Sequence, residues 1–254
     1  MSFQVKELGE FKYVDEGQGE ILFLLHGLFG ALSNWDKVIR HFSQEHRVII
    51  PILPILTMPI KSATINGLTE FVESFIKKFN LTDLTLLGNS LGGHIALVYT
   101  LKNKQNVKRI VLTGSSGLFE SSMGGTYPKR GDKKYVEERV RYTFYDPNVA
   151  SDELINEVFD ITNNIRKGLN IVAIAKSAQR QNMALEIDGL DVPTLLVWGL
   201  NDTITPPSVA HEFNRLLPNS ELRFIDKCGH APMMEHPEKF NVLLDEFLKV
   251  AVHA

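Results

Sequence analysis

The sequence predicts an α/β fold, because short apolar runs alternate along the chain with longer stretches of helical spacing. Most of the runs are apolar at consecutive positions, which is typical of strands buried on both faces of a parallel sheet. The runs are ILFLL (21–25), RVII (47–50), LTLL (84–87), RIVLT (109–113), TLLVW (194–198) and LRFI (222–225). Between them, residues 68–79 and 237–250 carry apolar side chains at i, i+3 and i+4, so both segments predict helices.

The alternation stops between residues 119 and 186, where helical patterns at 133–145 and 151–164 follow one another without a convincing strand. A helical insertion between two strands of one sheet usually lies over the strand ends, where α/β folds bind ligands. We therefore predict a core domain of residues 1–118 and 187–254 and a helical cap of residues 119–186.

Composition excludes several classes of protein. The chain has 254 residues, 44% of them hydrophobic, and a net charge of -3 without basic clusters, so nothing favours a nucleic-acid or membrane partner. The single cysteine, Cys228, cannot form an internal disulfide, and the N-terminus has no signal-peptide pattern. We expect a soluble cytoplasmic protein, a monomer or a homodimer. The histidines show no metal-ligand spacing, and we expect no cofactor.

Ser90 lies in GNSLGG, directly after the apolar run 84–87 and before a helical stretch. This is G-x-S-x-G in the context of strand, sharp turn and helix, which predicts a strained turn that exposes the serine hydroxyl at a helix N-terminus. The alternative is a glycine-rich connector with an incidental serine.

Asp202 and His230 follow two later predicted strands. A serine needs a base, and the base needs an orienting acid, so the chain order Ser90, Asp202, His230 predicts nucleophile, acid and base. Asp226 and His236 lie close by and compete for these roles, although His236 precedes Pro237 and is interpreted as a helix-terminus residue.

The attacked carbonyl also needs donors for its oxyanion. We predict the backbone N–H groups of Leu91, after the nucleophile, and of Leu28, in the loop HGLFG after the run 21–25. His26 is expected to brace that loop.

The segments HGLFG, GNSLGG, VPTLLVWGLNDTITP and IDKCGHAPMMEHPEKFNVLLDEFL together resemble the α/β-hydrolase superfamily over nearly the whole chain. The resemblance implies the α/β-hydrolase fold, with an eight-stranded, mostly parallel sheet and a helical cap after the sixth strand. It also implies that Ser90, Asp202 and His230 are the catalytic triad.

GNSLGG, VLTGSSGLF and YDPNVASDELINEVFD are further similar to hydrolases that cleave carbon–carbon bonds of aromatic ring-fission products. Those enzymes resemble one another in a cap arginine and in a tryptophan after the catalytic histidine, and Val158 and Ala231 stand at these positions. Arg166 or Arg180 could replace the missing cation, although we favour an interpretation of both as surface charges.

The segment PILPILTMPIKSAT has Ile52 where many superfamily members carry an aspartate. It could line the pocket mouth or be covered by a partner, but we favour a loop that packs on the core.

Three functions remain. The first is a serine hydrolase that acts on a small apolar carbonyl substrate, a carboxylic ester, through an acyl-enzyme. The second is carbon–carbon hydrolysis of a diketone-like substrate, and the third is a ligand-binding or signalling protein that retains the pocket. Epoxide hydrolases and dehalogenases are disfavoured because they need a carboxylate nucleophile where this chain has Ser90.

Overall fold

The protein contains one eight-stranded sheet in the order β1-β2-β4-β3-β5-β6-β7-β8, in a computed structural model that describes residues 3–30, 32–119 and 130–250. The strands are β1 (Lys6–Leu8), β2 (Phe11–Glu16), β3 (Ile21–Leu25), β4 (Arg47–Pro51), β5 (Leu84–Asn89), β6 (Val107–Thr113), β7 (Thr194–Gly199) and β8 (Ser220–Ile225). β1 and β2 pair antiparallel, as do β2 and β4, and all other neighbours are parallel. The predicted mostly parallel sheet is confirmed.

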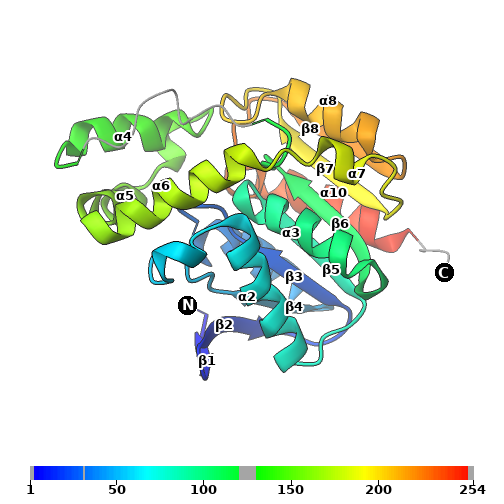
Figure 1. Ribbon diagram of the computed structural model, residues 1–254. Helices are drawn as coiled ribbons and strands as arrows, with labels where there is room; N and C mark the ends of the chain where they lie inside the picture. Colours follow the sequence, from blue (N-terminus) through cyan, green and yellow to red (C-terminus); the bar gives the residue numbers. More distant parts are fainter. Residues whose placement is uncertain (1–2, 31, 120–129, 251–254) are drawn as a thin grey trace.

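Helices lie on both faces of this sheet (Figure 1). They are α1 (Asp36–Phe42), α2 (Ile65–Lys78), α3 (Leu91–Lys102), α4 (Lys133–Tyr142), α5 (Asp152–Asn163), α6 (Ile165–Arg180), α7 (Ala184–Ile187), α8 (Pro207–Leu216), α9 (Pro232–Glu235) and α10 (Pro237–Lys249), with short 3₁₀ turns at Leu32–Trp35, Ile60–Ser62, Lys104–Asn106 and Pro147–Val149. Within the described ranges, no helix combines the length and the apolar character needed to span a membrane.

Alternate residues of each central strand point to opposite faces, and both faces are buried. In β3, Leu22 and Leu24 pack in a cluster with residues of α1 and α10, whereas Phe23 and Leu25 pack with residues of α2, α3 and α8. All four side chains are fully buried, which explains why the strand is apolar at consecutive positions.

The described part of residues 119–186 forms helices and contains no strand. α4, α5 and α6 lie together to one side of the sheet (Figure 1). α7 begins before residue 186 and ends at Ile187, so the predicted boundary falls inside this helix. Residues 120–129, part of the segment that opens the cap, lie outside the described residues, and the division into core and cap stays a prediction.

The proline-rich segment after β4 packs on the core. Leu53, Ile55 and Met58 are buried in the same cluster as residues of α2 and α3. The buried Asn170 of α6 donates hydrogen bonds from Nδ2 to the carbonyls of Ile55 (3.1 Å) and Met58 (2.9 Å). The interpretation of this segment as a core-packing loop is confirmed, and α6 anchors it.

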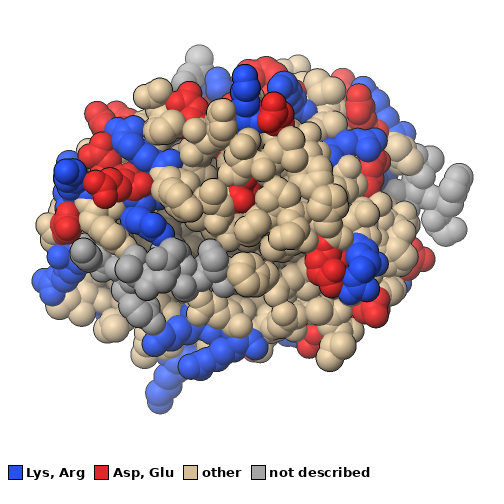
Figure 2. All heavy atoms as spheres, turned by 90° about the horizontal axis from the view of Figure 1, so that it is seen from above, with Lys and Arg blue, Asp and Glu red and all other residues tan. Residues whose placement is uncertain are grey.

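Charged side chains of both signs lie around the margin of the face that Figure 2 shows, and most of its middle is uncharged.

Candidate active site

Ser90 lies at the turn between β5 and α3 with φ 53° and ψ -119°, a backbone conformation that costs energy for a residue with a side chain. The glycines on either side of Ser90 have no room for a side chain. A Cβ on Gly88 would collide with the backbone of Gly92 and Gly93, and a Cβ on Gly92 would collide with the carbonyl of Leu25. The glycines of GNSLGG therefore allow the turn.

The loops after β5 and β6 are tied together at this turn. The Ser90 N–H donates to the Thr113 carbonyl (3.1 Å), and the Ser116 N–H donates to the Ser90 carbonyl (3.1 Å). Asn89 Nδ2 donates to the carbonyls of Thr113 (3.0 Å) and His230 (3.2 Å). Three strand ends are thus joined beside the serine.

The His230 ring and the Asp202 carboxylate form a hydrogen bond, with Nδ1 2.9 Å from Oδ2. A carboxylate oxygen only accepts, so Nδ1 carries the proton of this hydrogen bond. The Thr205 hydroxyl donates to the same Oδ2 (2.9 Å), and the N–H groups of Ile204 (2.8 Å) and Thr205 (3.0 Å) donate to Oδ1. Four hydrogen bonds thus hold the Asp202 carboxylate in place.

Asp202 is only 3% exposed and His230 only 6% exposed. Burial by itself would raise the pKa of Asp202, but attraction to His230 and the hydrogen bonds from His230 and Thr205 outweigh it, so this pKa lies below its ordinary value. Asp202 is therefore a carboxylate at neutral pH and can orient the ring.

The two competing residues lie elsewhere. Asp226 is exposed just after β8. His236 stands immediately before α10, and its Nε2 bonds to the carbonyl of Lys227 at 2.8 Å. The structure therefore brings Asp202, and not Asp226, to the His230 ring.

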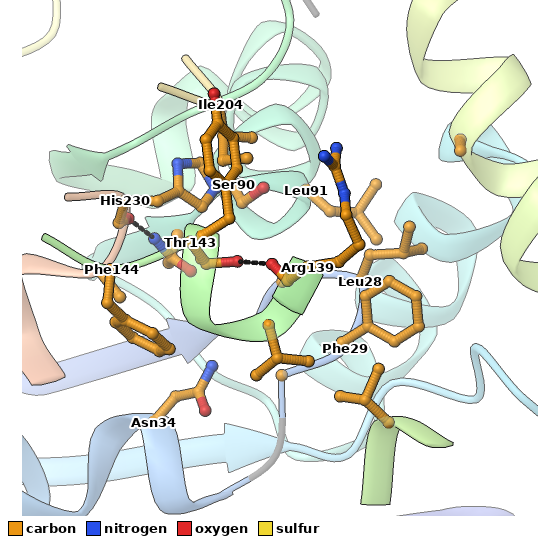
Figure 3. Close-up of a pocket in the computed structure, with 18 of the residues that line it drawn as sticks. Leu28, Phe29, Asn34, Ser90, Leu91, Arg139, Thr143, Phe144, Ile204 and His230 are labelled. Carbon is orange, nitrogen blue, oxygen red and sulfur yellow. Dashed lines mark hydrogen bonds between the residues drawn. The ribbon is translucent and has the colours of Figure 1, made fainter. Parts of the chain in front are cut away.

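A cavity of about 240 Å³ opens beside these groups, and Ser90, His230, Leu28 and Leu91 all line it (Figure 3). Arg139 is the only Lys, Arg, Asp or Glu among the described residues of its wall. Most of the remaining wall is apolar or aromatic and comes largely from α4, α5, α6 and the loop after β3: Phe29, Tyr135, Val136, Val140, Tyr142, Phe144, Leu154, Val158, Ala175, Ala178, Ile204, Ala231 and Met234.

His26 braces the loop that carries Leu28. The Leu53 N–H donates to His26 Nε2 (3.1 Å), so Nε2 is unprotonated and Nδ1–H donates to the Gly27 carbonyl (2.9 Å). Burial lowers the pKa of His26, and the bond to Gly27 only partly opposes this. A neutral imidazole therefore links the loops after β3 and β4.

Val158 and Ala231 are buried, apolar and part of the cavity wall. Arg166 and Arg180 are exposed and do not line the cavity, and Arg180 instead borders a separate surface groove. The favoured interpretation of both as surface charges is confirmed, and the alternative that either one supplies a cation to the cavity wall is wrong. The cation in the wall is Arg139 of α4, which sequence reasoning missed.

Two further residues at the site went unnoticed in the sequence. Thr205 fixes Asp202, and a signal for it exists, because an aspartate side chain in a turn often accepts a hydrogen bond from a backbone N–H two or three residues later. Gly114 has φ +51°, and a Cβ there would lie 2.8 Å from His230 Nδ1, so it must be glycine for the ring to fit. In the part of the chain that the structure describes, no three His, Cys, Asp or Glu side chains are grouped to hold a metal ion.

A family model described as the alpha/beta hydrolase fold matches residues 20–158 and 150–237. This chain belongs to the alpha/beta hydrolase fold family. The fold and the recognised family are therefore confirmed, and the protein is a hydrolase by family.

Relatives of this hydrolase include enzymes of different named activities. A 2-hydroxy-6-oxononadienedioate/2-hydroxy-6-oxononatrienedioate hydrolase 2 of Pseudomonas putida is 27% identical, over 94% of this chain and 92% of the relative. MGS-MChE2, an alpha/beta hydrolase from the metagenome of lagoon sediments at Mar Chica, Morocco, is 39% identical, with a TM-score of 0.80 over 97% and 98% of the chains. A serine hydrolase involved in carbazole degradation (CarC) is 26% identical, with a TM-score of 0.80 over 95% of each chain.

Proposed function

We propose that the protein is a serine hydrolase of small, mainly apolar carboxylic esters. The observation that carries this proposal is the position of Ser90, on a strained turn that faces the same cavity as the Asp202-bound His230. The cavity supports a small acyl group because it measures about 240 Å³ and has mainly apolar walls.

In the first step, Ser90 Oγ attacks the ester carbonyl while His230 Nε2 takes its proton. The resulting imidazolium is stabilised by the Asp202 carboxylate through the Nδ1–H bond. The N–H groups of Leu28 and Leu91 are placed in this proposal as donors to the oxyanion, and both residues border the cavity. The tetrahedral adduct then expels the alcohol, which receives the proton from His230.

In the second step, His230 Nε2 takes a proton from water, and the hydroxide attacks the acyl-enzyme. Collapse of that adduct breaks the bond to Ser90 Oγ, returns the proton to the serine and releases the carboxylic acid. No group other than the triad and the two amides is required.

The test uses a fluorophosphonate probe, which reacts with activated serines, and p-nitrophenyl esters of increasing acyl length. The parent protein should be labelled and should hydrolyse the short esters, and Ser90→Ala should lose both properties, with ester turnover falling on the order of 10⁴-fold or more. Ser208→Ala is the matched control, because Ser208 is exposed on α8 away from the cavity. A Ser90→Ala protein that hydrolyses esters at the parental rate would contradict the mechanism.

A second candidate is hydrolysis of a carbon–carbon bond in a diketone-like acid. The name of the Pseudomonas putida relative favours it, and so does Arg139, a cation in the cavity wall that suits a substrate with a carboxylate. Turnover of a ring-fission diketo acid at least as efficient as that of the best ester would establish this alternative. Tight binding of a small apolar ligand without turnover of either class would favour the ligand-binding alternative.

A further inference from the structure

Glu235 occupies a position that the proposed mechanism does not use. It is the last residue of α9, a single helical turn that begins just after His230 and Ala231. One carboxylate oxygen, Oε1, accepts a hydrogen bond from the N–H of Gly229 (2.7 Å), the residue before His230. The other, Oε2, accepts from the N–H groups of Tyr145 (2.8 Å) and Asp146 (3.3 Å).

Tyr145 and Asp146 belong to the connection between α4 and α5, and this connection also touches the histidine loop directly. The His230 N–H donates to the Thr143 carbonyl at 3.0 Å, and a Cβ on Gly229 would lie 2.7 Å from that carbonyl. The two segments therefore meet backbone to backbone. Thr143 and its neighbour Phe144 line the cavity, so this junction joins a cavity wall to the loop that carries the histidine.

We propose that Glu235 is a positioning residue that holds His230 in place by joining the histidine loop to the connection after α4. The inference rests on the proposed function, since it assumes that His230 is the base. One carboxylate oxygen of Glu235 binds the histidine loop and the other binds the connection after α4. Neither segment can therefore move relative to the other without loss of a charge-assisted hydrogen bond.

The environment of this carboxylate supports a functional role over a purely stabilising one. Glu235 is half-buried beside the buried Cys228, whose Sγ lies 3.9 Å from Oε1. Burial raises the pKa of Glu235, and the three amide donors only partly oppose this. Burial of this carboxyl group therefore carries an energetic cost, which its hydrogen bonds to the two segments only partly offset.

The test compares Glu235→Ala with Glu238→Ala, a matched control on the first turn of α10, where the carboxylate is exposed. On a short p-nitrophenyl ester, Glu235→Ala should lower kcat about 10²-fold, the loss that misplacement of a catalytic group by roughly 1 Å can cause. KM should stay within about threefold of the parent value, because Glu235 itself does not line the cavity. Glu238→Ala should change neither quantity.

Glu235→Gln separates positioning from simple stability. An amide has one acceptor oxygen, so it can serve Gly229 or the connection after α4, but not both. Its kcat should fall between those of the parent and Glu235→Ala, while its Tm stays within about 3 °C of the parent. A large fall in Tm with a parental kcat would show a structural role and overturn the proposal.

A readout independent of turnover is the downfield NMR resonance of the His230 Nδ1 proton, which reports the hydrogen bond to Asp202. It should shift or broaden in Glu235→Ala and stay unchanged in Glu238→Ala. A parent without ester turnover overturns the proposed function alone, and this resonance then decides the positioning role. An unchanged resonance in Glu235→Ala, or a parental kcat in an active protein, overturns the positioning role alone.

Discussion

The two sides of the cavity are built differently. On the sheet side, Ser90, Asp202 and His230 each follow a parallel strand, and hydrogen bonds tie these strand ends together. On the other side, which we call the cap side after the predicted cap, the wall comes from α4, α5 and α6, amphipathic helices whose outer faces are exposed. In the proposed mechanism, the sheet side holds the reacting groups and the cap side shapes the space for the substrate. Substitutions on the sheet side should therefore slow every substrate, and substitutions on the cap side should change the choice among substrates.

Asp202→Asn should have the largest effect on the sheet side. The amide cannot stabilise an imidazolium as a carboxylate does, and it can hold the ring in the wrong tautomer, so kcat should fall on the order of 10³- to 10⁴-fold for every ester. Steady-state kinetics on neutral and anionic esters measures this. Asp226→Asn is the control, because Asp226 is exposed after β8. Near-parental turnover by Asp202→Asn would contradict the assigned acid.

Gly114→Ala should slow all substrates about 10²-fold, because its Cβ would displace the His230 ring. Gly189→Ala is a matched control: Gly189 has φ +77°, also in the left-handed region, but nothing lies within 4 Å of its Cβ position. Both variants carry backbone strain, and only Gly114→Ala crowds the histidine. Equal kcat values in the two variants would show that the contact with His230 does not matter.

Arg139→Gln tests the cap side. Turnover of an anionic ester, such as the mono-p-nitrophenyl ester of a dicarboxylic acid, should fall about 10-fold in kcat/KM, the size expected for one hydrogen bond to a charged group. Turnover of a neutral ester of similar length should stay at the parental rate. Arg166→Gln, which changes an exposed cap arginine, should alter neither. An equal fall in kcat/KM for both esters would show that Arg139 affects every substrate, and it would contradict the assignment of substrate choice to the cap side.

Asn170→Ala should have the smallest effect on catalysis and a clear effect on stability. It removes the donors to the carbonyls of Ile55 and Met58 at a buried site, so the free energy of unfolding should fall by about 1–3 kcal/mol. Urea denaturation measures this loss, and kcat should stay within about twofold of the parent, since Asn170 does not line the cavity. Asn156→Ala, on the exposed face of α5, is the control. A parental unfolding midpoint for Asn170→Ala would show that α6 does not anchor the loop.

The central parallel strands were predictable because burial on both faces leaves a continuous apolar run, as at Leu22 to Leu25. β1 and β2 gave no such signal. β1 is an edge strand with two exposed residues, and β2 reads FKYVDE, in which charged side chains interrupt the apolar ones. Only the family resemblance implied all eight strands.

The positions of Ser90, Asp202 and His230 at one sheet edge were predictable because parallel strands bring their carboxyl ends together. Arg139 and Glu235 were not predictable in this way. Their surroundings depend on how α4 and its following connection approach the loops of the core, and chain order does not determine that approach. The open alternative for Arg166 and Arg180 has the same origin, because a helical pattern does not say which side of a helix faces the cavity.

The bond between Leu53 and His26 makes the loop that carries Leu28 sensitive to acid. The lowered pKa of His26 means that the unfolded chain takes up a proton more readily than the folded one. Stability linked to this residue is therefore complete above the ordinary histidine value of 6.5, decreases as the pH falls below it, and levels off once the pH is below the folded pKa. A protonated ring could no longer accept the Leu53 N–H, so the stability of the protein at acidic pH depends partly on a buried histidine that does not line the cavity.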